Sequence, residues 1–448
     1  MEKAYVDFNA ANGRVKPMHA VNNGPVYKFK ADQRITNMED YKAAGIPYAR
    51  NHDASFFATY GGSHTVDTCA VFPDFDADPY DEASYDFVWT DEYLKTIELA
   101  GTKTFYRLGS KIEHGVKKYG TLPPKDFHKW AVICEHIIRH YNYGWADGFH
   151  MDIEYWEIWN EPDLDADDAD DKRTWGGTAA QFYELYNITA KHLKSNFPEL
   201  KIGGPACANL DEQWLDGFFK ALEAPLDFFS WHRYAYDPKW IGEMTYKARK
   251  MLDDRGFADA ESILNEWNYV RSFVGDDFLY SLRRISDIKG AAFTAAVMSE
   301  CQNSPLDMLM YYDARPCAFN GLWKPYTYDR LKGYYPFVMF NSLYMLKNSV
   351  CVSSDNQNVY ICAAKNDKGS EGAVLVTYFN DDDNSPDIET KVGVSGFGGG
   401  NEVKAEYYML DEKHDLELIK EEFFTADKFS LCLNMPLYSS MLIKLKMR

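Results

Sequence analysis

Short apolar runs alternate with longer amphipathic stretches along most of the chain. Eight of the runs have the length and composition of buried strands, and they lie at residues 15–21, 46–51, 103–109, 155–161, 201–206, 227–234, 262–267 and 307–313. The stretches between them carry helix start and stop signals, such as Thr90-Asp91-Glu92 before a run that ends at Gly101. A repeated strand–helix pattern predicts a parallel sheet covered by helices, and a closed barrel requires eight strands. The predicted fold is therefore an α/β protein built on a (β/α)8 TIM barrel.

The pattern changes after a last predicted helix at about 332–347. From residue 350 onward, apolar and polar residues alternate in short segments, for example at 360–363 and 373–379, as in strands that bury one face. We expect this region to form an additional C-terminal β-sandwich domain. The strand-like stretch 4–9 precedes the barrel and is a candidate to pair with that domain. The predicted organisation is thus an N-terminal segment at 1–14, a barrel at 15–348 and a β-sandwich at 349–448.

Charge and the first residues narrow the possible partners and compartments. Lys and Arg number 48 and Asp and Glu 68, so the formal net charge is −20. Nucleic acids and anionic membrane surfaces are recognised through basic patches, so neither is an expected partner. No apolar run approaches the roughly 18 residues that a membrane span needs, and the opening Met-Glu-Lys-Ala-Tyr lacks the regions of a signal peptide. We therefore expect a cytoplasmic protein, and its oligomeric state stays open.

Two of the predicted strands end in a glutamate beside an asparagine. The segments are Trp-Glu-Ile-Trp-Asn-Glu-Pro-Asp at 156–163 and Ser-Ile-Leu-Asn-Glu-Trp-Asn at 262–268, and they place Glu161 and Glu266 at the ends of strands four and seven. In a parallel barrel, the carboxyl ends of all strands meet at one mouth, where the chemistry takes place. A pair of carboxylates at that mouth is the minimum equipment for hydrolysing a glycosidic bond. The alternative is that both glutamates are structural.

Further motifs accompany these segments in a fixed order along the chain. They are Arg50-Asn51-His52-Asp53 after strand two, Trp175-Gly176-Gly177-Thr178 before a helix with Tyr183 and Tyr186, Lys201-Ile202-Gly203-Gly204-Pro205 at strand five, and Ser230, His232 and Tyr234 at strand six. Together with Trp159-Asn160-Glu161-Pro162, this set resembles glycoside hydrolase family 39 over about residues 15–345. The resemblance implies a retaining O-glycosidase in which Glu161 is the acid/base and Glu266 the nucleophile. It also implies that Arg50, His52, Asn160, His232 and Tyr234 line the subsite of the terminal sugar.

Aromatic side chains near strand ends are candidates to stack on the apolar faces of sugar rings. We expect Trp267 and Tyr311 to contact the substrate, and further candidates are Trp159, Trp231, Tyr312 and Trp323. Two residues at strand six depart from the family pattern, because Trp231 stands where a small residue is typical and Arg233 where an aromatic one is typical. Both changes touch the sugar pocket, so they bear on the identity of the substrate rather than on the reaction type.

The acidic stretch 163–171 raises the question of a metal site. It holds six aspartates directly after strand four, but it lacks the fixed spacing and the glycine of a calcium-binding loop. The eight cysteines show no Cys-x-x-Cys spacing, so neither a zinc ribbon nor a dense disulfide framework is expected. We therefore predict a solvated loop at the barrel mouth, no metal and no cofactor.

The sequence thus predicts an exo-acting hydrolase that releases a terminal neutral sugar from an oligosaccharide or small glycoside, in the first place a β-xylosidase or related pentosidase. Two alternatives stay open. Basic residues near strand ends would hold a uronate in an iduronidase-like or glucuronidase-like enzyme, and these are Arg107, Lys111, Arg233 and Arg315. In the second alternative, the chain is a catalytically silent carbohydrate-binding protein that retains the barrel. Its two intact glutamates argue against this alternative.

Overall fold

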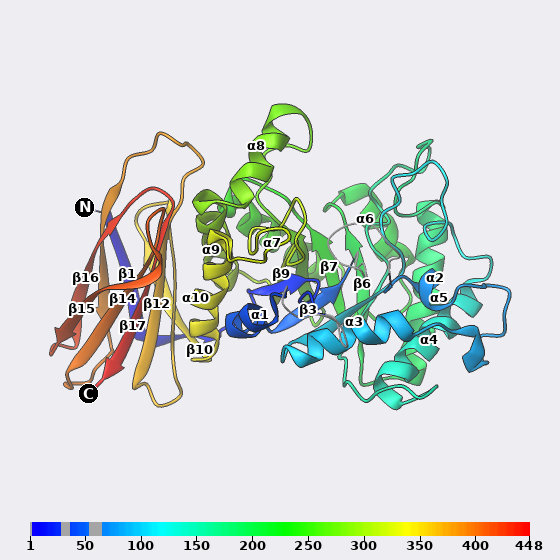
Figure 1. Ribbon diagram of the computed structural model, residues 1–448, viewed down its shortest axis with the longest axis horizontal. Helices are drawn as coiled ribbons and strands as arrows, with labels where there is room; N and C mark the ends of the chain where they lie inside the picture. Colours follow the sequence, from blue (N-terminus) through cyan, green and yellow to red (C-terminus); the bar gives the residue numbers. More distant parts are fainter. Residues whose placement is uncertain (1, 28–35, 53–64) are drawn as a thin grey trace.

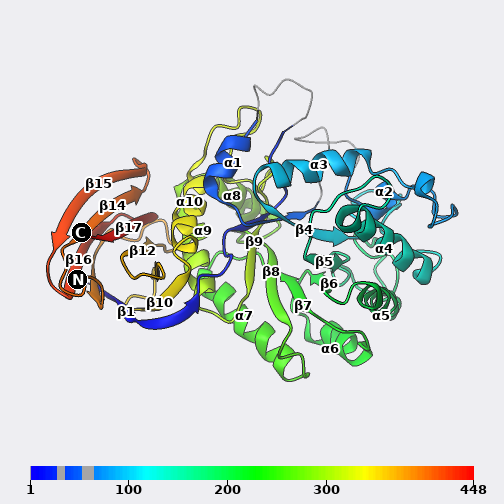
Figure 2. The same cartoon turned by 90° about the horizontal axis from the view of Figure 1, so that it is seen from below.

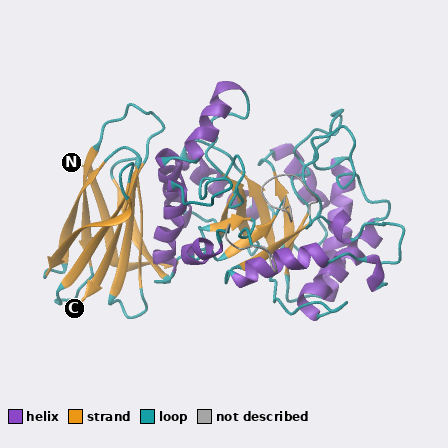
Figure 3. Ribbon diagram, in the orientation of Figure 1, coloured by secondary structure: helices purple, strands orange, loops and turns teal. Residues whose placement is uncertain are grey.

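The computed structural model describes residues 2–27, 36–52 and 65–448. It contains a closed barrel of parallel strands and, beside the barrel, a large β-sheet (Figure 1). Figure 3 shows that helices surround the barrel strands, whereas the second part of the molecule consists of strands and loops. The chain therefore combines an α/β barrel with a sheet-rich C-terminal region, as predicted.

Eight strands form the barrel, and each pairs in parallel with the next. They are β2 (Ala20–Asn22), β3 (Tyr48–Asn51), β4 (Lys103–Leu108), β5 (Tyr155–Ile158), β6 (Lys201–Cys207), β7 (Phe228–His232), β8 (Glu261–Trp267) and β9 (Met308–Tyr311). β2 also pairs with β9, which closes the ring. The predicted TIM barrel is thus confirmed, but its first strand is shorter than the predicted 15–21, because Pro17 in that stretch has no N–H to donate to a neighbouring strand.

Helices connect the strands and cover the outside of the barrel. They are α1 (Met38–Ala44), α2 (Thr68–Val71), α3 (Val88–Leu99), α4 (Phe127–Tyr143), α5 (Ala179–Asn196), α6 (Glu212–Ala221), α7 (Pro238–Asp253), α8 (Gly275–Ile285), α9 (Ile288–Gln302) and α10 (Tyr335–Tyr344), with short 3₁₀ helices η1 (Glu82–Ser84) and η2 (Lys332–Tyr334). Local signals set several of their starts. A capping box between Thr178 and Gln181 begins α5, and the side chain of Asp126 accepts a backbone hydrogen bond at the start of α4. Within the described ranges, every helix falls short of the length and apolar character that a membrane crossing requires.

The second part of the molecule is a nine-stranded sheet with the order β15–β14–β17–β12–β11–β10–β1–β13–β16. Its strands are β1 (Glu2–Arg14), β10 (Asn348–Ser354), β11 (Val359–Lys365), β12 (Glu371–Tyr378), β13 (Ile388–Ser395), β14 (Val403–Leu410), β15 (Asp415–Phe424), β16 (Lys428–Met435) and β17 (Ser439–Met447). Seen from below, the sheet curls around its own core, to which inward-facing residues such as Val6, Val374, Val392 and Ile443 contribute (Figure 2). β1 lies inside the sheet, antiparallel to β10 and parallel to β13, so the N-terminal segment pairs with C-terminal strands.

A cluster of charged and aromatic residues joins the sheet to the barrel. Lys289 of α9 has a side chain that is 1% exposed, and its Nζ donates to the carbonyl oxygen of Asp381 (2.7 Å) and to Oδ1 of Asp383 (2.9 Å). Asp381 follows β12, and its carboxylate also accepts from Nε of Arg271 (2.9 Å) and from the hydroxyl of Tyr269 (2.5 Å). Because Tyr269 and Arg271 follow β8, the cluster ties the loop after that strand to the sheet.

Candidate active site

A cavity of about 670 Å³ opens at the carboxyl ends of the barrel strands. Its lining residues follow β3, β4, β5, β6, β7, β8 and β9, and they are His52, Ile112, His114, Asn160, Glu161, Leu164, Arg173, Ala208, Asn209, Arg233, Tyr234, Glu266, Phe273, Phe278, Tyr312 and Phe319. Both predicted glutamates therefore face one space. Asp53, which is part of the strand-two motif, lies outside the described residues.

Glu161 reaches the cavity from a tight turn after β5. Its φ of +48° is in the left-handed region, and the turn is held by hydrogen bonds from the Glu161 backbone N–H to the carbonyl of Ala206 (2.9 Å) and from Oγ1 of Thr174 to the Glu161 carbonyl (2.6 Å). Burial of the carboxyl raises its pKa to about 7, although the positive charges of Arg50 and Arg173 act in the opposite direction. Glu161 is therefore half-protonated near neutral pH, as a group that both gives and takes a proton should be.

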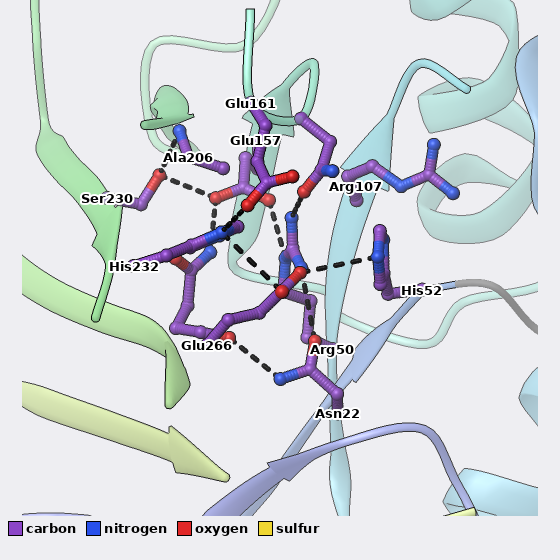
Figure 4. Close-up of polar contacts among 12 residues, drawn as sticks. Asn22, Arg50, His52, Arg107, Glu157, Glu161, Ala206, Ser230, His232 and Glu266 are labelled. Atoms are coloured by element: carbon purple, nitrogen blue, oxygen red, sulfur yellow. Dashed lines mark hydrogen bonds and ion pairs between the residues drawn. The ribbon is translucent and has the colours of Figure 1, made fainter. Parts of the chain in front are cut away.

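Glu266 lies in a different electrostatic environment on β8. Its Oε1 accepts from Nη1 of Arg50 (2.8 Å) and lies 3.3 Å from Nε2 of His52, while its Oε2 accepts from the hydroxyl of Tyr234 (3.0 Å). The Arg50 guanidinium stabilises the carboxylate form of Glu266, and the tyrosine hydroxyl fixes its orientation. The carboxylate of Glu266 thus lies in a defined position beside a cation, and Figure 4 shows it near Arg50, His52 and His232.

Arg50 connects the residues of the site. It is fully buried, and its guanidinium donates to Glu157 (2.7 Å), Asn22 (3.1 Å) and Asn160 (2.7 Å) in addition to Glu266. Burial lowers the pKa of Arg50, but the two carboxylates more than offset this and raise it overall. Its donors are engaged by protein groups and it is not among the residues that line the cavity, so the structure does not support the predicted contact of Arg50 with the sugar. Its contacts are those of a residue that positions other side chains of the site.

Glu157 is a site residue that sequence reasoning missed. Its carboxylate is fully buried beneath the cavity, where it pairs with Arg50 and accepts hydrogen bonds from Oγ of Ser230 (2.6 Å) and Nδ2 of Asn265 (2.5 Å). Four charged or polar groups thereby hold one another in place, which satisfies the requirement that a buried charge be paired and hydrogen-bonded. The signal was present in the sequence, because a glutamate flanked by Trp156 and Ile158 in a buried strand needs a partner inside the barrel.

His232 lies between Glu161 and Glu266. Its Nδ1 lies 2.8 Å from Oε1 of Glu161 and 3.5 Å from Oε2 of Glu266, and one ligand atom from each of the three residues lies within 4.8 Å of the others. Burial lowers the pKa of His232 to about 4, so the ring is neutral. The same three groups would offer ligands to a metal ion, but the Arg50 cation already neutralises Glu266, which makes the set a poor site for a second cation.

Two predicted sugar-stacking residues lie outside the cavity. Trp267 is fully buried against Phe293 of α9, and Tyr311 packs on Trp267 and Phe337. The structure therefore does not support the predicted sugar contact of either residue. For Trp267 the reason is that successive residues of a strand point to opposite faces, so it points away from the lumen that Glu266 faces. Of the six aromatic candidates near strand ends, Tyr312 is the one that lines the cavity within the described chain.

The basic residues considered for a uronate differ in their surroundings. Arg107 is buried and pairs with Asp67 (2.9 Å), and neither Lys111 nor Arg315 lines the cavity. Arg233 does line it. The acidic loop is less solvated than predicted, because Asp165 forms a bidentate pair with Arg173 and Asp163 accepts the backbone N–H groups of residues 208 and 209.

A (β/α)8 barrel that holds two glutamates across one mouth defines a glycoside hydrolase. Residues 50–315 match the model for glycosyl hydrolases family 39, and the chain belongs to that family.

Comparison with individual proteins gives the same class. The chain is 31% identical over 145 residues to a beta-xylosidase from Caldicellulosiruptor saccharolyticus, which covers 31% of this chain and 25% of that protein. It is 25% identical over 224 residues to a beta-xylosidase from Geobacillus stearothermophilus, covering 46% and 41% of the two chains. The matched part thus spans less than half of either relative. A glucosidase structure from Croceicoccus marinus shares the fold, with a TM-score of 0.81 and 22% identity over 100% of this chain and 99% of that one.

Proposed function

We propose that the protein is a retaining, exo-acting glycosidase, and in the first place a β-xylosidase. The observation that carries the retaining mechanism is that an oxygen of Glu161 and an oxygen of Glu266 lie within 4.8 Å of each other. Retaining enzymes hold their two carboxyl groups about 5–5.5 Å apart, whereas inverting enzymes leave about 6.5–9.5 Å for a water molecule. The close spacing supports direct attack on the sugar by a carboxylate.

In the first step, the Glu266 carboxylate attacks the anomeric carbon and the bond to the leaving oxygen breaks. Glu161 gives its proton to that oxygen, which its pKa of about 7 allows near neutral pH. Arg50 keeps Glu266 ionised, and Tyr234 directs its Oε2. The product of this step is a glycosyl ester on Glu266 together with the released alcohol.

In the second step, water replaces the leaving group. Glu161, now a carboxylate, takes a proton from the water, whose oxygen attacks the anomeric carbon and releases Glu266. The neutral ring of His232 beside Glu161 adds no positive charge that would lower the pKa of the acid. Both carboxyl groups return to their starting states, so the cycle uses no cofactor.

The choice of sugar is supported by relatives and by the cavity lining. Both curated relatives are named beta-xylosidases. His52, Asn160 and Tyr312 line the cavity beside the two glutamates and offer hydrogen-bonding groups suited to the hydroxyls of a neutral sugar. A uronide-specific enzyme is the alternative, and an intact acid and nucleophile argue against a catalytically silent binding protein.

The test begins with a panel of nitrophenyl pentosides, hexosides and uronides, in which we expect the β-xyloside to be hydrolysed fastest. The 2-fluoro derivative of the active sugar, with a good leaving group, should then inactivate the enzyme and label Glu266, because the fluorine slows breakdown of the covalent ester. Mass spectrometry of the labelled peptide identifies the residue. A label elsewhere, or a product of inverted anomeric configuration, would contradict the mechanism, and preferential hydrolysis of a uronide would contradict the substrate.

A further inference from the structure

Arg233 carries a charge that no carboxylate in the described part of the chain neutralises. It follows β7 and lines the cavity, and its guanidinium lies 3.9 Å from the centre of the Trp240 ring. Its Nε is shielded from solvent and has no hydrogen-bond partner, and among the described residues no carboxylate forms an ion pair with the guanidinium. Stacking on the indole orients the guanidinium, and its two terminal amino groups, unlike Nε, are not shielded from solvent.

Other arginines around the site are paired. Arg50 bonds two glutamates, Arg107 bonds Asp67, and Arg173 forms a bidentate pair with Asp165. A partly buried charge without a partner costs free energy. Because Arg233 lies at a cavity wall, we expect a bound ligand to supply the opposite charge. The ligand group that matches a planar guanidinium best is a carboxylate, which accepts two parallel N–H bonds.

Acidic residues near Arg233 are committed elsewhere. Arg233 also lines a second pocket of about 500 Å³, whose other walls are Asp163, Asn209, Leu210, Asp211, Trp240, Met244 and Lys247. The carboxylate of Asp163 accepts the backbone N–H groups of residues 208 and 209, and that of Asp211 accepts the N–H of Trp214 at the start of α6. Lys247 pairs with Glu212 at 2.9 Å.

The second pocket lies on the side of Glu161. Its walls come from residues that follow β5 and β6 and from β7 with α7, and Asp163 is two residues beyond Glu161. Two of the groups that hold the nucleophile, Arg50 and His52, come from the end of β3 across the barrel, whereas Tyr234 follows β7. In the proposed mechanism the sugar ring sits over Glu266 and the departing oxygen faces Glu161. A leaving group therefore extends toward Arg233.

We infer that Arg233 binds a carboxylate carried by the leaving group, so that acidic glycosides of this kind are the preferred substrates. The inference rests on the proposed role of Glu161 as the acid. It differs from uronide specificity, because the carboxylate is placed on the alcohol that departs and not on the sugar that Glu266 attacks. A charge-assisted pair of this type contributes about 1.5–3 kcal/mol, or roughly a 10-fold to 150-fold preference.

The test compares two xylosides that differ only in the charge of the leaving group, 3-carboxyphenyl and 3-carbamoylphenyl β-xyloside. The quantity measured is the ratio of their kcat/KM values, and each variant is compared with the unmodified enzyme, so differences in phenol reactivity cancel. Arg233→Met keeps the packing on Trp240 but removes the charge, and we expect it to lower the ratio about 10-fold or more. Arg233→Lys, which keeps the charge without the planar fork, should give an intermediate ratio.

Lys247→Met is the matched control. It removes a positive charge from the same pocket, but this charge is already paired with Glu212. The ratio should stay unchanged in this variant. An equal loss for both xylosides in Arg233→Met, or the same fall of the ratio in Lys247→Met, would overturn the inference. So would a loss that appears with a uronide sugar instead of a carboxylated leaving group.

A direct binding measurement separates this inference from the proposed function. The leaving phenols themselves, 3-hydroxybenzoate and 3-hydroxybenzamide, are titrated into the protein and followed by NMR. We expect the benzoate to bind about 10-fold more tightly, with the preference lost in Arg233→Met. If the xylosides are not hydrolysed but this preference is present, the proposed substrate fails and the anion site stands; if the preference is absent, the anion site fails.

Discussion

The surroundings of Glu161 disfavour its ionised form, whereas those of Glu266 stabilise it. Burial raises the pKa of Glu161 to about 7, while the guanidinium of Arg50 at 2.8 Å favours the ionised form of Glu266. Two identical side chains thus experience opposite electrostatic effects from their neighbours, as the proposed roles of acid and nucleophile require. Acid/base sites can be recognised by a pair of titratable groups whose environments favour opposite protonation states.

Arg173 provides a way to test that assignment. Its positive charge lowers the pKa of Glu161, so Arg173→Met should raise that pKa further. The acid must be protonated, and its loss defines the alkaline side of the pH profile, so the fall of kcat/KM should move to higher pH by about 0.5 units. The measurement is kcat/KM against pH for an aryl glycoside with a poor leaving group.

Asp165→Asn is the matched variant with the opposite sign. Asp165 is the ion-pair partner of Arg173, and its negative charge raises the pKa of Glu161. Its neutralisation should therefore lower that pKa and move the fall of kcat/KM to lower pH. Shifts in the same direction for both variants, or no shift in either, would show that another group controls the alkaline side.

At the residue scale, the sequence predicted the site residues best where a polar residue directly follows a buried apolar strand. Glu161 and Glu266 were predicted because each follows a buried strand and stands beside an asparagine, and the structure brings both to one cavity. Glu157 was missed because it lies inside such a run. The role of Arg50 was only half predicted, since its four partners come from three different strands or their ends, and their convergence depends on the closed barrel.

Strand β6 shows how an element positions Glu161. A Cβ added at Gly203 would lie 2.2 Å from the carbonyl oxygen of Phe228 on β7, so only glycine allows the two strands to approach this closely. Further along β6, the carbonyl of Ala206 accepts the backbone N–H of Glu161. Gly203 therefore supports the packing of β6 on β7, and Ala206 of the same strand supports the turn that presents Glu161.

Gly203→Ala should lower the free energy of unfolding by about 1–3 kcal/mol, because the added methyl group meets backbone that cannot move aside. Chemical denaturation followed by intrinsic fluorescence measures the change. Gly115→Ala is the control, since the nearest atom to its added Cβ is 3.8 Å away, and we expect a change within about 0.5 kcal/mol. Equal stability of the two variants would show that β6 and β7 separate easily.

The order of strands and helices was predictable because hydrophobic periodicity repeats eight times. The direction of individual side chains was less so. Trp267 and Tyr311 were assigned to the substrate from their places near strand ends, yet the alternation along β8 sends Trp267 to the opposite face from Glu266. Applied to Glu266 and its neighbour, the two-residue period would have corrected the assignment.

At the scale of the whole molecule, the sheet supports one wall of the cavity. Phe273 and Phe278 line the cavity and belong to the segment between β8 and the end of α8. The same segment is tied through Tyr269 and Arg271 to Asp381 of the sheet, which Lys289 also contacts. The contacts link the region after residue 350 to the shape of the site, although no residue of the sheet lines the cavity in the described chain.

Asp381→Asn should loosen this wall and weaken the connection around the buried Lys289. We expect the free energy of unfolding to fall by about 1–3 kcal/mol, which is less than for a fully buried pair because Asp381 is 23% exposed. KM should rise more than kcat falls, since the change affects the binding wall and leaves both glutamates in place. Thermal unfolding and steady-state kinetics measure the two effects.

Asp382→Asn is the control for this prediction. Asp382 lies in the same loop, is exposed, and bonds only residues of its own loop among the described contacts. Its replacement should leave both stability and KM near their original values. If the two variants have the same stability and the same KM, the contacts between the sheet and the cavity wall do not affect substrate binding.

The position of β1 has a consequence for how the chain is made. Residues 2–14 leave the ribosome before the whole barrel, but the strands on both sides of β1, β10 and β13, are synthesised after it. During that interval the inward-facing Ala4, Val6 and Phe8 have no core to enter, and both edges of the segment are free to pair with another chain. The nascent protein therefore carries this strand without its partners throughout the synthesis of the barrel, and we expect exchange of the strand between two molecules to be a route of misassembly.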